Sequence, residues 1–159
     1  MKIKFLTIAL FLFMGTKLMA QQPKILPQFT FYTLDGKAFS TKDVDRTKKS
    51  LLMLFDCTCE HCQRETKLLF SNYGAFKGVN IYMITLDEVF AIQQFFGSYA
   101  PGLNLKPNVK VLQDKKKIFI PTFLPDQYPA IYLYSEGGKL LEYSTGDGGM
   151  KKMLKALKK

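Results

Sequence analysis

The chain has 159 residues, with 23 lysines and arginines against 13 aspartates and glutamates, so its formal net charge is +10 at pH 7. This length suffices for one domain with a substantial core and excludes two. The positive charge would suit an anionic surface, but much of it lies in residues 115–117 and 151–159, and such lysine runs usually form solvated faces.

The N-terminal segment has the pattern of a secretory signal. Lys2 and Lys4 precede an apolar run over residues 5–14, and the small residue Ala20 follows. The run is shorter than the ~20 apolar residues that a membrane-spanning helix needs. We therefore predict that residues 1–20 are a cleaved signal peptide, with an uncleaved anchor as the alternative.

Export sets the surroundings of the remaining domain, residues 21–159. We predict a periplasmic or secreted monomer, and we expect no nucleic-acid partner because an exported chain rarely meets nucleic acid.

These compartments permit disulfides. Cys57, Cys59 and Cys62 cannot all pair within one chain. One of them must be free, metal-bound or shared with another molecule.

The domain begins with an extended segment and a hairpin. Two prolines in residues 21–28 predict an extended lead-in. Apolar residues 29–32 and 38–39 flank the dipeptide Asp35-Gly36. An Asp-Gly pair between apolar runs is typical of a β-hairpin turn, so we predict one here.

The next strand leads into a CxxC motif. Residues 51–55 are apolar at every position, which predicts a central strand buried on both faces. Directly afterwards, Cys59 and Cys62 open a predicted helix over residues 60–72. Two thiols on one helical turn can close a disulfide with little backbone movement. The first lies at the positive end of the helix dipole, which favours the thiolate that attacks disulfides.

A repeated strand and helix follow the motif. Residues 79–85 predict a second buried strand, and residues 88–99 a helix that stops before Pro101. Strand, helix, strand and helix at this spacing predict a right-handed βαβ unit in a parallel sheet. Residues 109–112 predict a further short strand.

The last third of the chain predicts a hairpin and a terminal helix. A short helix is expected over residues 116–120, ended by Pro121. Residues 130–134 and 139–145 flank a glycine-containing turn and predict a β-hairpin. Asp147 is expected to cap a final helix. The apolar positions of that helix recur at helical spacing, at Met150, Met153, Leu154 and Leu157.

This order of parts resembles exported thioredoxin-like thiol:disulfide oxidoreductases of the redoxin type, over about residues 28–159. The motif Cys59-x-x-Cys62-x-x-Glu65 is similar to the active-site pattern of the envelope members of that family. Pro129, just before a predicted strand, matches the position of the family's cis-proline. The resemblance implies an α/β thioredoxin-like fold, with a central mixed β-sheet, helices on both faces, and Pro129 against the dithiol.

The chain also departs from the family it resembles. Thr58 stands where family members often carry tryptophan, and Met53 stands where thioredoxin has a buried acid. A proton relay of the thioredoxin kind is therefore not expected. Glu65 could instead supply a carboxylate near the thiols, or it could simply be an acid that satisfies the dipole in the first turn of its own helix.

The resemblance implies that Cys59 is the nucleophile and Cys62 the resolving thiol. A structural disulfide without turnover is the alternative. Structural zinc is not expected, because no other cysteine or histidine lies outside this segment. His61, as imidazolium, would stabilise a Cys59 thiolate and make the centre more oxidising, whereas Glu60 would act in the opposite direction.

Cys57, two residues before Cys59, is the odd thiol. Three interpretations stay open. It is an inert buried cysteine, a third redox participant, or a soft-metal ligand together with Cys59 and Cys62.

We thus predict an exported enzyme that exchanges disulfides with protein thiols, without a cofactor or metal, and with a membrane or periplasmic redox partner. A peroxiredoxin-like peroxidase is one alternative. That family uses Thr or Ser three residues before the reacting cysteine and a nearby arginine, whereas this chain has Asp56 there and only Arg46 and Arg64. A Cu(I)-handling thioredoxin-like protein that uses the three cysteines is the other alternative.

Overall fold

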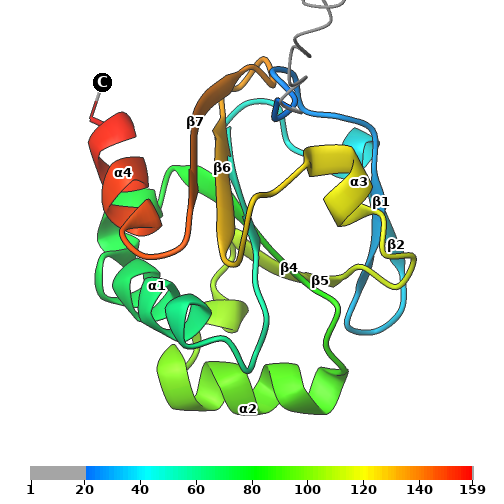
Figure 1. Ribbon diagram of the computed structural model, residues 1–159, viewed down its shortest axis with the longest axis vertical. Coiled ribbons are helices and arrows are strands. Elements are labelled where there is room, and N and C mark those ends of the chain that lie inside the picture. The colour runs from blue at the N-terminus through cyan, green and yellow to red at the C-terminus, as the bar shows by residue number, and fades with distance from the viewer. Residues whose placement is uncertain (1–20, 159) are drawn as a thin grey trace, which may run out of the picture.

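The computed structural model describes residues 21–158, in which seven strands form one mixed sheet with helices on both faces (Figure 1). The strands are β1 (Thr30–Thr33), β2 (Ala38–Ser40), β3 (Lys49–Leu54), β4 (Val79–Thr85), β5 (Val109–Gln113), β6 (Ala130–Tyr134) and β7 (Leu140–Thr145). The helices are α1 (Glu60–Ser71), α2 (Val89–Tyr99), α3 (Phe119–Phe123) and α4 (Gly149–Ala156), with short 3-10 turns η1 (Thr41–Asp43), η2 (Tyr73–Phe76) and η3 (Leu103–Leu105). The predicted signal segment, residues 1–20, lies outside the described residues. In the described part of the chain, no helix is both long and apolar enough to cross a membrane.

Strand β3 lies near the centre of the sheet, whose order is β2-β1-β5-β4-β3-β6-β7. It pairs in parallel with β4 and antiparallel with β6. All but the first residue of β3 and every residue of β4 are buried. Helix α1 connects these two parallel strands, so the predicted central strand and βαβ unit are confirmed. The unbroken apolar runs fit because both faces of these strands are covered.

The N-terminal lead-in runs beside the outer strand β7. The backbone N–H of Leu26 donates to the carbonyl of Gly138, and the N–H of Leu140 donates to the carbonyl of Lys24, both at 2.8 Å. The predicted hairpin follows as β1 and β2, which pair antiparallel. Its turn contains Gly36 at φ +86°, a left-handed conformation that glycine adopts without a steric penalty.

The two faces of the sheet are covered by different elements (Figure 1). One face packs against α1, α2 and α4, whose buried side chains include Leu69, Ile92, Phe95, Phe96, Met150 and Met153. The other face packs against α3, and its core includes the buried rings of Phe29, Phe31, Phe39, Phe119 and Phe123. The predicted α/β architecture, a mixed sheet with helices on both faces, is confirmed.

The predicted position of α3 was wrong, because the helix runs over Phe119–Phe123 and contains Pro121. The carboxylate of Asp114 accepts the N–H groups of Ile118 at 3.0 Å and Phe119 at 2.7 Å, which fixes the start of the helix. Pro121 then falls in the first turn, where a backbone N–H has no partner within the helix. The helix ends at Leu124, which has a φ of +54°.

The predicted cap of α4 was also wrong. The N-cap is Gly148, at φ +83°, and no side chain caps the helix from this position. Asp147 instead directs its carboxylate to α1. The apolar face of α4 is as expected, since Met150 and Met153 are buried. The cap prediction failed because a residue from another helix occupies that role, as described below.

Candidate active site

The two thiols of the CxxC motif differ in exposure. Cys59 is the N-cap of α1 and is half-buried, whereas Cys62, in the first turn, is fully buried. The carbonyl of Cys59 accepts the N–H of Gln63 at 3.0 Å, which begins the helix. All three cysteines of the chain are free thiols. The first thiol of the motif is therefore reachable from outside, and the second lies behind it.

Cys62 lies against the backbone of the preceding loop. The N–H of Asp56 donates to its Sγ at 3.4 Å. Burial raises the pKa of the Cys62 thiol, and this backbone hydrogen bond only partly opposes the increase. Cys62 is therefore held as a protonated thiol near neutral pH until a partner takes its proton.

Cys57 is bound to an acid that the sequence analysis did not single out. Its backbone N–H donates to Oδ2 of Asp87 at 2.8 Å, and the hydroxyl of Thr85 donates to the same oxygen at 2.8 Å. Partial burial acts to raise the pKa of Asp87, but the hydrogen bonds from Cys57 and Thr85 prevail and lower it. Burial, and then the Asp87 carboxylate, raise the pKa of the Cys57 thiol. These contacts favour the inert interpretation of Cys57.

The sequence held a signal for Asp87. It lies two residues after the end of β4, the strand that pairs in parallel with β3, and the CxxC loop follows β3. The carboxyl ends of parallel strands meet at the same edge of a sheet, so an acid after β4 is brought beside the loop after β3.

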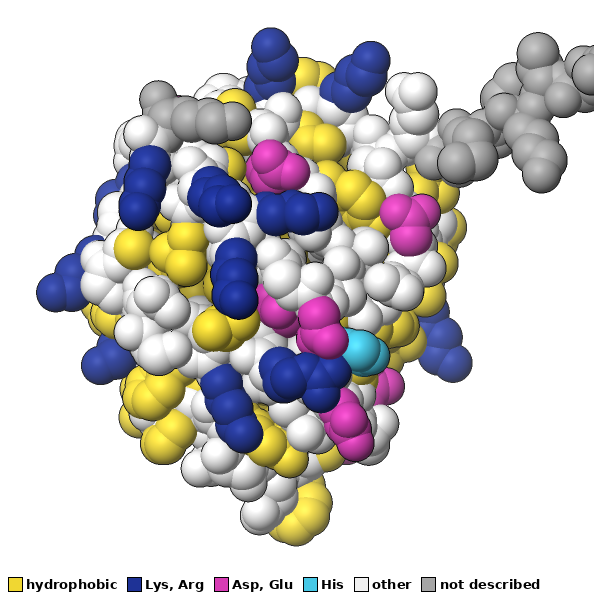
Figure 2. Space-filling view, turned by 60° about the vertical axis from the view of Figure 1, so that its left-hand side comes forward, with side chains coloured by type: hydrophobic (Ala, Val, Ile, Leu, Met, Phe, Trp, Pro, Cys, Tyr) yellow, Lys and Arg dark blue, Asp and Glu magenta, His cyan; other side chains and the backbone are white. Residues whose placement is uncertain are grey.

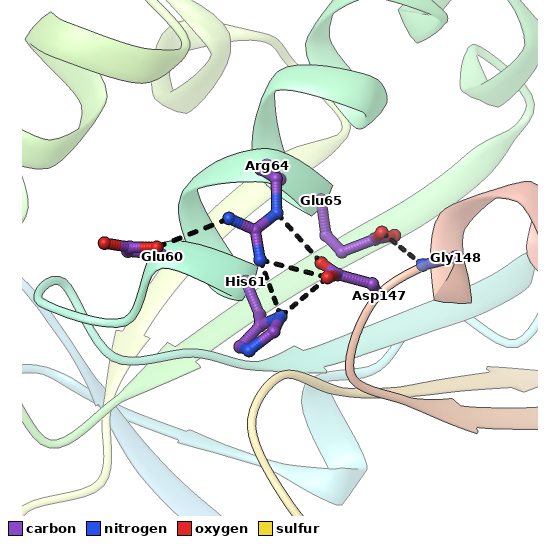
Figure 3. A network of polar contacts seen from close by, with 6 residues as sticks. All are labelled: Glu60, His61, Arg64, Glu65, Asp147 and Gly148. Atoms are coloured by element: carbon purple, nitrogen blue, oxygen red, sulfur yellow. Dashed lines mark hydrogen bonds and ion pairs between the residues drawn. The ribbon is translucent and has the colours of Figure 1, made fainter.

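The charged residues of the CxxC turn form a network with Asp147 (Figure 3). Arg64 donates to the two carboxylate oxygens of Asp147 at 3.1 and 3.0 Å, and its Nη1 lies 3.5 Å from Glu60. Nδ1 of His61 lies 2.8 Å from Asp147 and 2.7 Å from Nη2 of Arg64. His61 thus contacts Asp147 in the loop before α4, whereas Glu60 lies on the other side of Arg64 and pairs with that residue (Figure 3). The chain's single histidine accordingly lies among acidic and basic side chains at the surface (Figure 2).

Glu65 is the buried acid of the site, with only 1% of its surface exposed. Its Oε1 accepts the N–H of Gly148 and its Oε2 accepts the N–H of Met150, both at 2.6 Å. Its carboxylate therefore lies at the positive end of α4 rather than at that of its own helix (Figure 3). It provides the cap that Asp147 was expected to give.

Pro129 lies at the same end of the sheet as the dithiol. The Tyr128–Pro129 peptide bond is cis, as the resemblance implied. Pro129 is buried and directly precedes Ala130, which pairs with Leu54 at the end of β3. Tyr128 packs on the same apolar cluster as Cys57 and Cys59. The cis-proline loop and the CxxC loop are thus neighbours.

The described residues include no group of three or more histidine, cysteine, aspartate or glutamate side chains placed to hold a metal ion. Cys57 and Cys62, both with a raised thiol pKa, would have to lose their protons before they could bind a soft metal.

Comparisons with known proteins identify a family and a fold for this chain. The model of the AhpC/TSA family matches residues 23–140. A comparison with curated protein sequences finds no match. Three solved structures illustrate the fold, and all are less than 25% identical to this chain.

The first is DsbF from Mycobacterium tuberculosis, with a TM-score of 0.69 and 22% identity over 87% of this chain and 98% of that one. The second is a secreted disulfide oxidoreductase from the same organism, with a TM-score of 0.65 and 24% identity over 82% of this chain and 95% of that one. The third is a peroxiredoxin-like protein from Aquifex aeolicus, with a TM-score of 0.66 and 15% identity over 87% and 86%. The predicted thioredoxin-like fold is confirmed.

Proposed function

Because the chain belongs to the AhpC/TSA family, we propose that it is an exported thiol:disulfide oxidoreductase that exchanges disulfides with protein thiols through Cys59 and Cys62. The observation that carries this proposal is the pairing of a reachable thiol at a helix N-terminus with a buried thiol one turn along. The helix dipole favours the thiolate form of the first cysteine, which is the attacking species.

In the reducing direction, the Cys59 thiolate attacks one sulfur of a substrate disulfide. The substrate S–S bond breaks, one substrate sulfur leaves as a thiolate, and a mixed disulfide forms at Cys59. Cys62 then gives up its proton and attacks Sγ of Cys59. The second substrate sulfur departs with the electron pair of the mixed disulfide and takes up a proton, and a Cys59–Cys62 disulfide remains. The oxidising direction is the same sequence reversed.

The surrounding groups assist these steps. The raised pKa of Cys62 keeps this thiol from attacking early, and the Asp56 N–H would stabilise charge that develops on its sulfur. The neighbouring cis-proline loop offers backbone to an extended substrate segment. Burial, and then the Asp87 carboxylate, raise the pKa of the Cys57 thiol, which disfavours its part in the exchange.

Three cysteine variants test the assignment. In an insulin-reduction assay, Cys59→Ser should abolish turnover. Cys62→Ser should accumulate a mixed disulfide, whereas Cys57→Ser, the matched control two residues away, should keep most activity. Equal losses in the Cys57 and Cys59 variants would overturn the roles assigned here.

The expected location and partners complete the proposal. We propose that residues 1–20 direct export to the periplasm or beyond, where a membrane or periplasmic partner would renew the dithiol or disulfide of this monomer. The secreted Mycobacterium tuberculosis neighbour supports this location. Fusing residues 1–20 to a reporter enzyme that is active only after export should yield an active, shortened reporter. An inactive reporter retained in the cytosol would contradict export.

A peroxidase is the second candidate, supported by the family match and the peroxiredoxin-like neighbour. Two contacts weigh against it. The carboxylate of Asp56 is occupied by the N–H and hydroxyl of Thr58, at 2.7 and 2.6 Å, and Arg64 is bound to Asp147. Peroxide consumption much faster than that of free thiols, and lost in Cys59→Ser, would favour the peroxidase.

A further inference from the structure

Asp147, which the sequence predicted only as a helix cap, lies against the first turn of the dithiol helix. It belongs to the loop between β7 and α4 and is half-exposed. Its carboxylate accepts two hydrogen bonds from Arg64 and lies 2.8 Å from Nδ1 of His61 (Figure 3). The hydrogen bond from Arg64, and then that from His61, lower the pKa of Asp147, so the acid is ionised at neutral pH.

The residues on either side hold Asp147 in place. The N–H of Gly146 donates to the carbonyl of Pro129 at 3.0 Å, and the N–H of Gly148 donates to Glu65 at 2.6 Å. Both glycines adopt left-handed backbone conformations, with φ of +63° and +83°. Asp147 is therefore fixed between the cis-proline loop and α1, unlike a freely moving surface acid.

The charge of Asp147 opposes the charges that would favour a thiolate. Positive side chains over the first turn of α1 add to the helix dipole, and a stabilised Cys59 thiolate makes a dithiol more oxidising. Arg64 and His61 are the basic side chains of this turn, and Asp147 contacts both. Glu60 reaches Arg64 only at 3.5 Å and is more exposed.

On the premise of the proposed function, we propose that Asp147 is a positioning residue that lowers the reduction potential of the Cys59/Cys62 pair by neutralising Arg64 near the start of α1. The acid acts through Arg64 rather than through contact with a thiol.

The test is the equilibrium of the dithiol with glutathione, measured by thiol trapping at a pH where the thiolate absorbance shows that Cys59 is ionised. Asp147→Asn should shift this equilibrium toward the reduced form by about twofold to fivefold, the usual size of a charge effect at a helix end. Because a tenfold change in the equilibrium constant of a two-electron couple is about 30 mV, this shift raises the reduction potential by about 10 to 20 mV. The glutathione equilibrium of Asp147→Glu, which keeps the negative charge, should stay close to that of the original protein.

Arg64→Gln should shift the equilibrium in the opposite direction, and the double variant should lie between the two. A purely structural role for Asp147 would instead move both single variants in the same direction, because each loosens α4 from α1. Glu136→Gln is the control, since it removes the same charge from the exposed turn at the other end of the β6–β7 hairpin.

The outcomes separate the two proposals. If the original protein exchanges disulfides but Asp147→Asn leaves the equilibrium within the spread of the Glu136→Gln control, the inference about Asp147 is wrong and the proposed function stands. If the original protein forms no Cys59–Cys62 disulfide in any glutathione buffer, the proposed function itself fails.

Discussion

On one face of the sheet, α3, β1 and β2 bury a core rich in aromatic rings, whereas on the other face three helices bury a mixed core of aliphatic and aromatic side chains that also holds a thiol and a carboxylate. Polar groups buried there have partners, and the carboxylate of Asp114 accepts two backbone N–H groups at the start of α3. The hydroxyl of Tyr132 donates to the carbonyl of Phe123 at 3.0 Å, and that of Tyr134 to the carbonyl of Pro23 at 3.4 Å.

The helical face carries greater polar costs. Glu65 is buried and depends on two backbone N–H groups of α4, and the buried hydroxyls of Thr66 and Ser144 have no hydrogen-bond partner in the described part of the protein. Buried polar groups destabilise a fold unless they are paired. The difference is that the face under α3 pairs its buried acid and tyrosine hydroxyls, while the helical face, which holds the dithiol, leaves two buried hydroxyls unpaired.

The largest effect is expected on the aromatic face, from Phe123→Ala. The ring of Phe123 stacks on Phe119 at 4.3 Å and contacts Tyr132 at 5.5 Å between centroids. The free energy of unfolding should fall by about 3–5 kcal/mol, as is usual for a buried phenylalanine. Urea unfolding measures this loss. The glutathione equilibrium of the folded protein should stay unchanged, and a change there would show that the two faces are not separate.

On the helical face, Glu65→Gln should lower the free energy of unfolding by about 2–3 kcal/mol, because the amide would present an NH2 group to one of the two backbone N–H donors that now bind the carboxylate. Amide exchange should accelerate in α4, at Met150 above all, and remain slow in β1. Equal acceleration in both elements would mean that α4 and the aromatic face unfold together.

A smaller effect is expected from Asp87→Asn, which weakens the hydrogen bonds to Cys57 and Thr85. Because the acid is only partly buried, the expected loss is about 1 kcal/mol at neutral pH. The pKa of Asp87 is lowered by folding, so its contribution is complete above the unfolded value, about 3.9, and is lost as the pH falls through the folded value. The stability difference between the variant and the original protein should therefore shrink in acid. A gap that widens in urea titrations below about pH 4 would contradict this.

The smallest effect is expected from Phe90→Ala, a matched control for Phe123→Ala. Phe90 is 73% exposed at the start of α2. Its removal should change the free energy of unfolding by less than about 0.5 kcal/mol. If Phe90→Ala lowered the free energy of unfolding as much as Phe123→Ala, burial of the ring would not explain the effect of the Phe123 variant.

The sequence predicted what depends on neighbouring residues. The bounds of β4 and β6 were obtained from their largely apolar runs, and the placement of Cys59 at the start of α1 came from the CxxC motif directly after a strand. The contacts that surround the dithiol were not predicted, because their partners lie far apart in the chain. Arg64 and Asp147 are separated by 83 residues, and Cys57 and Asp87 by 30. The start of α3 was also predicted wrongly because it depends on a contact with another residue, the hydrogen bond from the N–H of Phe119 to the carboxylate of Asp114.

The pairing of the lead-in with β7 has a consequence for association between chains. An edge strand with free N–H and C=O groups is a template for pairing with another copy, which leads to aggregation. At one edge of this sheet β2 is only three residues long, and at the other the lead-in already occupies the N–H of Leu140 and the carbonyl of Gly138. A chain shortened to begin at residue 27 would release both groups and uncover the apolar surface that Leu26 now contacts. Removing so few residues would therefore leave backbone groups at the start of β7 available for pairing with another chain.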